Sequence, residues 1–313
     1  AGNWPGATKN NAEWFPPKER AIAQGIFGAG ASLGSVISAP IIALLYIAFG
    51  WKMTFVLIAI LGIVWVIPWL VMNKATPDKH PWLTDKEREH ILAKPIVNGV
   101  EAQAEVPVLH WKELLKFRNT WGIIMGRFFI DPVWWLFVTW LPTFLKEQFL
   151  FDIKQIGAFT WLPYVFAAVG SLMGGYHSSW QVKKGVNAEK ARKNSIAIGC
   201  AIMLVSLIAI VYFLGTLKET PVLAMILIGC TLFGFQFLIG NLQTLPSDYF
   251  NGKNVGTVSG MGGTAAVVGT LLTTWAVPII TKTSYNSFFI LAAVLVPLTW
   301  LSIKYITTKK LKN

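Results

Sequence analysis

The feature that most constrains this chain is its succession of apolar blocks, each long enough to cross a bilayer. A transmembrane helix needs about 20 predominantly apolar residues in a row. Eight such blocks are visible, and a shorter ninth block occupies residues 1–15. The eight cover residues 21–47, 51–73, 121–145, 156–178, 195–214, 221–244, 255–280 and 286–306. Because a helix satisfies its own backbone in lipid, we expect an all-α polytopic membrane protein.

Composition and motifs exclude several function classes. Mean hydropathy is +0.53 and charged residues make up 13% of the chain, roughly half the charged fraction of a soluble domain. The two cysteines lie in apolar blocks, and the four histidines show no metal-ligand spacing, so we expect no cofactor and no metal. No His-Glu-x-x-His motif, phosphate loop or paired Cys and His nucleophile is present, and we therefore expect no enzyme.

Basic residues are distributed unevenly between the loops. If the blocks alternate across the membrane, one set of loops carries 20 basic residues and the opposite set carries five. The basic set, which includes the Lys190–Lys193 cluster and the C-terminal tail, is then cytoplasmic by the positive-inside rule. The formal charge of +12 is thus explained by topology in an inner membrane, and we expect no nucleic-acid partner.

Two charged residues interrupt the block at 121–145. Arg127 and Asp131 are four residues apart, at a depth where ionised side chains are costly and usually functional. Pro132, which follows, lacks a backbone donor and can break the helix next to both charges. These residues predict a binding site for a small anion at Arg127. A buried structural pair on one helix face is the alternative, since the spacing permits it.

Other polar and aromatic side chains in the apolar blocks are candidate contacts for the same anion. We select Asn241 and Gln243 from a polar segment in which Gln236, Gln243 and Thr244 share a helical face, together with Ser35 and Trp135. Each has a structural alternative: amides can join helices, a serine can bond its own backbone and a tryptophan can fill the core. The pairs Gly30/Gly34 and Gly170/Gly174 predict close helix packing.

The chain also contains an internal repeat with an offset of 235 residues. Glu13-Trp14-Phe15 corresponds to Asp248-Tyr249-Phe250, Lys18 corresponds to Lys253, and three glycines coincide. Long-offset repeats are typical of transporters built from two halves. The same offset predicts an N-terminally truncated twelve-span protein, with a nine-span protein as the alternative. The expected parts are residues 1–73, a cytoplasmic linker with amphipathic helices at 74–118, and a six-helix bundle at 119–313.

Several strings together resemble the major facilitator superfamily, and within it the anion:cation symporters that carry hexuronates. They are Glu13-Trp14-Phe15-Pro16, Gly30-Ala31-Ser32-Leu33-Gly34, Arg127-Phe128-x-x-Asp131-Pro132-Val133-Trp134-Trp135, Ile156-Gly157-x-Phe159-x-Trp161-Leu162-Pro163 and Ser247-Asp248. The resemblance covers the whole chain and implies a major facilitator fold lacking roughly the first three and a half transmembrane helices. Two positions depart from the family pattern. Ser179 and Trp180 replace the loop's gating charges, and Ala31 stands where galactonate carriers have glutamine.

The resemblance implies proton-coupled uptake of sugar acids such as galacturonate or glucuronate by a monomer that alternates its access. Arg127 would bind the carboxylate, and Asp131 would orient Arg127 or take part in proton coupling. A cytoplasmic gating group would comprise Glu13, Arg20, Asp248 and Lys253. An organic-anion or drug transporter is the alternative, and a membrane sensor without transport is a more remote one.

Overall fold

The computed structural model of the chain describes residues 3–16, 18–92, 96–97, 100–101, 108–217, 220–250, 253–281 and 285–307. Its helices are α1 (Asn3–Trp14), α2 (Arg20–Met72), α3 (Asp85–Leu92), α4 (Trp111–Leu114), α5 (Arg118–Phe149), α6 (Ile153–Lys183), α7 (Ala188–Leu217), α8 (Pro221–Tyr249), α9 (Lys253–Ile280) and α10 (Asn286–Ile306). Two strands of two residues, β1 (Ile96–Val97) and β2 (Val100–Glu101), form an antiparallel pair. Apart from that pair, the described elements are helical, as predicted.

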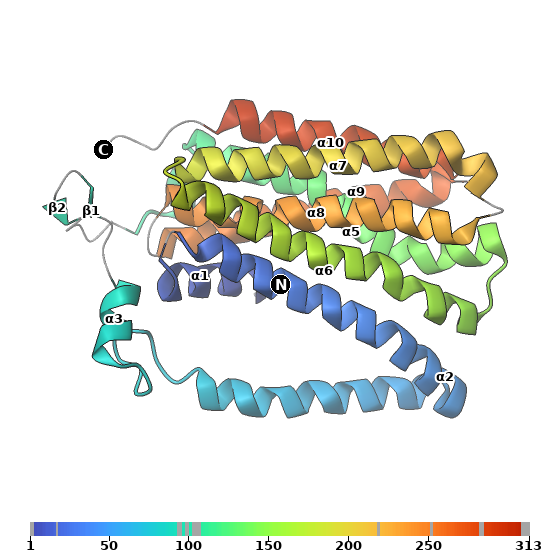
Figure 1. Ribbon diagram of the computed structural model, residues 1–313, viewed down its shortest axis with the longest axis horizontal. Coiled ribbons are helices and arrows are strands. Elements are labelled where there is room, and N and C mark those ends of the chain that lie inside the picture. The colour runs from blue at the N-terminus through green and yellow to red at the C-terminus, as the bar shows by residue number, and fades with distance from the viewer. Residues whose placement is uncertain are drawn as a thin grey trace.

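The predicted spans are confirmed by the lengths and composition of the helices. Among the described residues, seven helices are long and apolar enough to cross a membrane. One of them, α2, has 53 residues and would extend about 80 Å if straight, more than twice a bilayer's hydrocarbon core. It reverses direction at Gly50, where φ is 72° and ψ is 173° (Figure 1). Its two halves correspond to the blocks predicted at 21–47 and 51–73, and the chain is a multi-pass membrane protein.

The long helices lie side by side, with α8 the most buried of the candidate spans (Figure 1). The first half of α2 packs along α6 and also contacts α8. On the other side of α8, α7 packs against α8 and α10, and α5 packs against α9 and α10. The short helix α1 lies mainly against α9. Segments from both parts of the predicted repeat therefore meet around α8.

Glycines allow the closest helix contacts, although only one of the two predicted pairs makes them. A Cβ added at Gly174 would lie 2.1 Å from the Phe237 carbonyl oxygen of α8. Gly170 makes a similar contact one turn away, which confirms the prediction for α6. Gly30 and Gly34 have no heavy atom within 4 Å of such a Cβ, so that prediction is wrong. In α2 the close approach is made by Gly25, whose added Cβ would lie 2.7 Å from the Ser171 carbonyl oxygen.

The second half of α2 lies apart from the other helices (Figure 1). From Trp51 to Met72 nearly every side chain is exposed, with Thr54 as the buried exception. Apart from Lys52 and Thr54 near its start, this segment is almost entirely apolar, and it includes Trp51, Trp65 and Trp69. An apolar helix of this length is stable with its surface exposed only in a lipid environment or against another apolar surface.

A capping box between Thr84 and Glu87 opens α3, in the segment predicted as the linker. The Thr84 backbone N–H donates to a carboxylate oxygen of Glu87 at 2.9 Å, and the Glu87 N–H donates back to the Thr84 hydroxyl. The backbone hydrogen bond from Thr84, followed by the bond from its hydroxyl, lowers the pKa of Glu87 below its usual value. A second capping box, between His110 and Glu113, starts α4.

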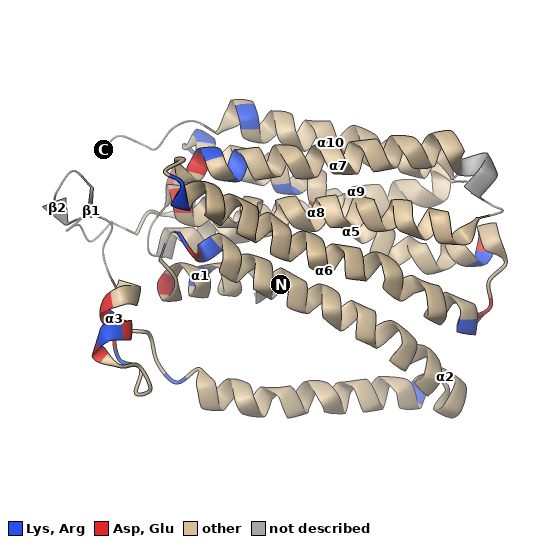
Figure 2. Cartoon of the chain, viewed as in Figure 1, with Lys and Arg blue, Asp and Glu red and all other residues tan. Residues whose placement is uncertain are grey.

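The described charges gather at one end of the bundle (Figure 2). That end holds the start of α2, the linker helix α3 and the junction between α6 and α7, while the opposite end carries few charges. This arrangement places the basic loops of the sequence analysis together in space.

Candidate functional site

Arg127 and Asp131 form an ion pair on α5 between the helices. Nε and Nη2 of Arg127 both donate to the Asp131 carboxylate, the second at 2.9 Å. Each residue is 8% exposed, so the pair is removed from bulk solvent. The helix continues without interruption from Arg118 to Phe149. Pro132 therefore does not break the helix, and the i, i+4 spacing brings the two charges into contact.

Arg127 lines a small pocket between α1, α5, α8 and α9. Gln243 of α8 and Ser259 of α9 line it as well, and Pro5 and Thr8 of α1 cover it. The Ser259 hydroxyl is buried and has no hydrogen-bond partner among the described residues. The pocket volume is about 10 Å³, which is roughly the room that one water molecule needs. In this conformation the pocket is closed around the guanidinium.

A chain of hydrogen-bonded amides reaches this pocket from the charged end of the bundle. Asn11 of α1 donates from Nδ2 to Oε1 of Gln24 at 2.8 Å. Gln24 of α2 in turn donates from Nε2 to Oε1 of Gln243 at 2.6 Å. Gln24 and Gln243 are 2% and 6% exposed. Neither Asn11 nor Gln24 was selected from the sequence.

The other amides of α8 join helices. Asn241 was expected to face the cavity, but its Nδ2 donates to the backbone carbonyl oxygens of Gly174 and Phe237 at 3.1 and 3.0 Å. Gln236 donates to the Ser32 hydroxyl of α2 at 3.0 Å. Of the polar face predicted on α8, only Gln243 lines the Arg127 pocket.

Ser35 and Trp135, two further predicted contacts, lie away from this pocket. The Ser35 hydroxyl donates to the Ala31 carbonyl at 3.3 Å, which is the backbone-bonded alternative. Trp135 is 47% exposed. Its neighbour Trp134 is the one that packs inside, stacked on Phe235 with ring centroids 5.2 Å apart.

The residues predicted to gate the charged end occupy separate contacts. Arg20 donates to the carbonyl oxygens of Ala12, Phe15 and Ser247 at 3.0 to 3.1 Å, which ties α1 and α2 to the end of α8. Glu13 pairs with Lys9, 3.5 Å away on its own helix. The side chain of Lys253 lies outside the described residues.

Asp248 pairs with a residue that the sequence analysis missed. Nε of Arg192 lies 3.3 Å from Asp248, and Nη1 of Arg192 donates to the Ser178 hydroxyl at 2.5 Å. Arg192 has no exposed surface. The prediction that the Lys190–Lys193 cluster only marks a cytoplasmic loop is therefore wrong for Arg192, because this residue joins α6, α7 and α8. A missing acidic partner in the α6–α7 loop was the available clue.

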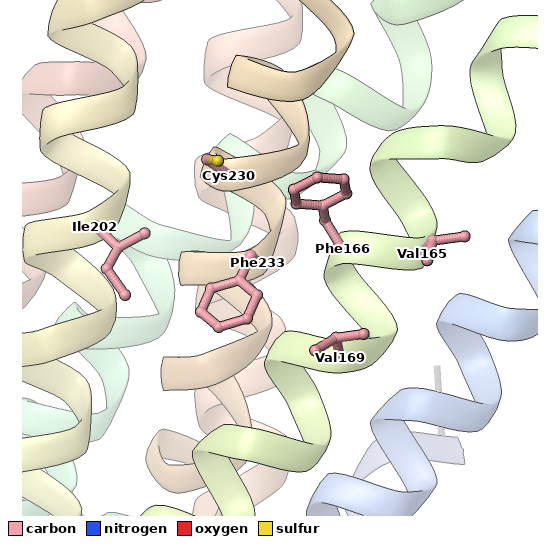
Figure 3. Close-up of a pocket in the computed structure, with 6 residues that line it drawn as sticks. All are labelled: Val165, Phe166, Val169, Ile202, Cys230 and Phe233. Carbon is pink, nitrogen blue, oxygen red and sulfur yellow. The ribbon is translucent and has the colours of Figure 1, made fainter.

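A larger cavity between the described helices lies elsewhere and lacks groups for an anion. Val165, Phe166, Val169, Ile202, Cys230 and Phe233 line about 450 Å³ between α6, α7 and α8 (Figure 3). With no charged or amide group in its wall, this cavity has nothing to replace the water around a carboxylate. The Arg127 pocket is therefore the candidate site.

Comparison with known proteins establishes the family. The sequence pattern of the Major Facilitator Superfamily matches residues 1–274. A solved bacterial homologue of the iron transporter ferroportin, in an outward-facing state, superposes with a TM-score of 0.51 over 97% of this chain and 86% of its own. Its sequence is 12% identical, so this likeness concerns the fold alone. The chain belongs to the Major Facilitator Superfamily, as predicted.

Among its relatives are transporters of sugar acids. The chain is 35% identical over 267 residues to the hexuronate transporter of Escherichia coli strain K12, covering 84% of this chain and 59% of that protein. It is 34% identical over 205 residues to the galacturonate transporter of Dickeya chrysanthemi, covering 64% and 57%. The chain thus spans less than two thirds of the length of these relatives. Both are named as transporters, which agrees with the expectation that the chain is not an enzyme.

Proposed function

We propose that this protein is a secondary active transporter that takes up hexuronate-type sugar acids together with protons. It works as a monomer in the inner membrane and alternates access between a bundle that includes residues 1–73 and a bundle at 119–313. Residues 74–118 connect the two bundles on the cytoplasmic side. The names of the hexuronate and galacturonate transporters support the substrate class. The uneven charge of the two ends supports the cytoplasmic placement of the C-terminus.

The observation that carries this proposal is the buried guanidinium of Arg127 in the wall of a pocket that Gln243 and Ser259 also line. A guanidinium has five N–H donors in a planar fork. Asp131 accepts from Nε and Nη2, and Nη1 remains for a substrate carboxylate. A charged sugar acid that leaves water needs such a partner, because an uncompensated buried carboxylate costs several kcal/mol. Gln243 and Ser259 supply further groups for carboxylate or hydroxyl oxygens.

Asp131 orients Arg127 in this proposal. A two-point contact between carboxylate and guanidinium fixes the plane of the fork, and both residues belong to one helix. The pair also keeps the site neutral before the substrate arrives, which lowers the cost of burying the arginine.

Substrate entry requires the pocket to open. Its volume is far below that of a sugar acid, and α1 covers it through Pro5 and Thr8. Movement of α1 and α9 away from α5 and α8 would expose Arg127. In this proposal the hydrogen bonds of Arg20 to Ser247 and to α1 keep the charged end of the bundle closed. The ion pair between Asp248 and Arg192 helps to keep it closed as well. Lys253 stays in the gating group as a prediction. Glu13 is left out of it here, because its exposed partner Lys9 belongs to the same helix.

A direct uptake assay tests the proposal. Cells that produce the protein are given labelled galacturonate or glucuronate with an inward proton gradient, with and without a protonophore. We expect accumulation of both acids that the protonophore abolishes, and competition by unlabelled hexuronate but not by neutral galactose. If no hexuronate accumulates and cells instead expel an organic anion or a drug, the alternative transporter class replaces this one.

A further inference from the structure

We infer that Gln24 and Asn11 are positioning residues that make Gln243 a hydrogen-bond donor toward the Arg127 pocket. This inference rests on the proposed function and adds to it a determinant of anion recognition. Its basis is the direction of the hydrogen bonds in the chain Asn11–Gln24–Gln243, hereafter the amide relay. Neither Asn11 nor Gln24 lines the pocket, and both act through Gln243.

The relay has a direction because each amide has a donor end and an acceptor end. Asn11 donates to the oxygen of Gln24 at 2.8 Å, which leaves the nitrogen of Gln24 to donate to Gln243 at 2.6 Å. The oxygen of Gln243 is thereby occupied, and its NH₂ group is the end available to the pocket. Consecutive hydrogen bonds in a buried chain strengthen one another, so the orientation at one end is transmitted to the other.

That orientation suits an anion. The pocket already contains the guanidinium of Arg127 and the buried, unpartnered hydroxyl of Ser259. An NH₂ group adds donors for a carboxylate or for sugar oxygens. An amide oxygen in the same place would repel a carboxylate. The direction of the relay therefore favours acceptor-rich, negatively charged ligands.

A single substitution at the far end is expected to reverse the relay. Asn11→Asp leaves only acceptor atoms at that position, so Gln24 must turn its nitrogen toward residue 11 and its oxygen toward Gln243. Gln243 then donates to Gln24 and presents its oxygen to the pocket. Both hydrogen bonds of the relay are kept, and only their direction changes.

The chain offers a matched control in Asn10, the preceding residue of α1, which is exposed. Asn10→Asp introduces the same charge in the same helical turn without entering the relay. A third variant, Gln24→Met, deletes both hydrogen bonds at similar volume and leaves Gln243 free to follow the ligand.

The test measures the Kd of the purified protein for galacturonate and its thermal unfolding midpoint. When a group that donates to a substrate carboxylate is replaced by an acceptor, the affinity for that substrate falls roughly tenfold or more. We expect Asn11→Asp to weaken binding by about that factor, Gln24→Met by about two- to threefold, and Asn10→Asp by less than twofold. The unfolding midpoints of Asn11→Asp and Asn10→Asp should agree.

The reverse order would overturn the inference. If the relay were merely structural, Gln24→Met would be the most damaging variant and Asn11→Asp would match Asn10→Asp in Kd. Should Asn11→Asp fail to fold, the comparison of Gln24→Met with Asn10→Asp decides, and equal Kd values contradict the relay. Wild-type protein that does not bind galacturonate overturns the proposed function and this inference together. Wild-type binding with equal Kd for the two aspartate variants overturns the relay alone.

Discussion

Two buried arginines occupy contrasting surroundings in this bundle. Arg127 finds its carboxylate one turn away on its own helix and lines a pocket. Arg192 reaches partners on two other helices, Ser178 of α6 and Asp248 of α8, and has no exposed surface. Because the first pair is satisfied within α5, it does not restrain neighbouring helices. The second pair restrains three helices at once.

The different surroundings of Arg127 and Arg192 indicate two different roles for a buried arginine. A buried charge is tolerated when it is paired and hydrogen-bonded, and a buried pair by itself is weak evidence for stability. The pocket beside Arg127 favours a ligand role, and the cross-helix contacts of Arg192 favour a structural or gating role. Substitution at the two places should therefore have different consequences.

The largest effect is expected at Arg127. Arg127→Met combined with Asp131→Asn removes both charges, so no unpaired ion remains buried and the fold should be kept. Galacturonate uptake should fall at least about 100-fold, because the carboxylate would lose its cation. Uptake in cells and the unfolding midpoint in detergent are the measurements. Wild-type uptake by this double variant would remove Arg127 from the site.

The second effect is on stability at Arg192. Arg192→Met removes one cationic partner of the buried Asp248, which also interacts electrostatically with Arg20. We expect a loss of about 1.5–3 kcal/mol, the worth of a hydrogen bond to a charged group, measured as a lower unfolding midpoint. Adding Asp248→Asn should restore most of the midpoint and of the uptake. Lys193→Met is the matched control, because Lys193 forms a more exposed pair with Glu189 and should cost less than about 1 kcal/mol. A double variant that stays inactive would move Arg192 from the structural role to the transport step.

A smaller effect distinguishes orientation from proton transfer at Asp131. Asp131→Asn can still accept a hydrogen bond from Arg127 but cannot carry a proton. If Asp131 orients the guanidinium, uptake driven by the proton gradient should continue at roughly a tenth of the wild-type rate, the cost of one weakened charged hydrogen bond. Substrate exchange that persists without gradient-driven uptake would instead assign proton coupling to Asp131.

The smallest effect is expected at an exposed pair. Glu13 and Lys9 lie one turn apart on α1 with side chains about half exposed, and such pairs contribute about 0.3–0.5 kcal/mol. Glu13→Gln should lower the free energy of unfolding by no more than about 0.5 kcal/mol. The rate of uptake should stay within about twofold of wild type. A strong loss of uptake at unchanged stability would return Glu13 to the gating group.

The spans could be predicted because lipid imposes a length and a composition that local sequence records. The reversal at Gly50 was visible as a boundary between two apolar blocks. The packing partners were less visible. Gly30 and Gly34 have the spacing of a close contact, but the contact of α2 with α6 is made on the face of Gly25. The spacing of small residues shows that they share one face of a helix. Which face packs against a neighbouring helix depends on the assembled bundle.

The site was predicted in part for a similar reason. Arg127 was evident because a charge in an apolar block is rare. Arg192 was hidden among loop lysines, since its burial depends on Asp248, which is 56 residues away. Adjacent tryptophans differ by one position in the helix, so sequence could not assign Trp134 to the interior and Trp135 to the surface. The roles of Gln24 and Asn11 depend on contacts between three helices that no local pattern records.

The reversal at Gly50 also bears on how the protein enters its membrane. A single residue with a left-handed backbone joins two spans, and Lys52 lies two residues after it. So short a connection leaves no slack for one span to be threaded before the other. The two spans are therefore expected to insert together as a helical hairpin, with the Lys52 ammonium group at its tip.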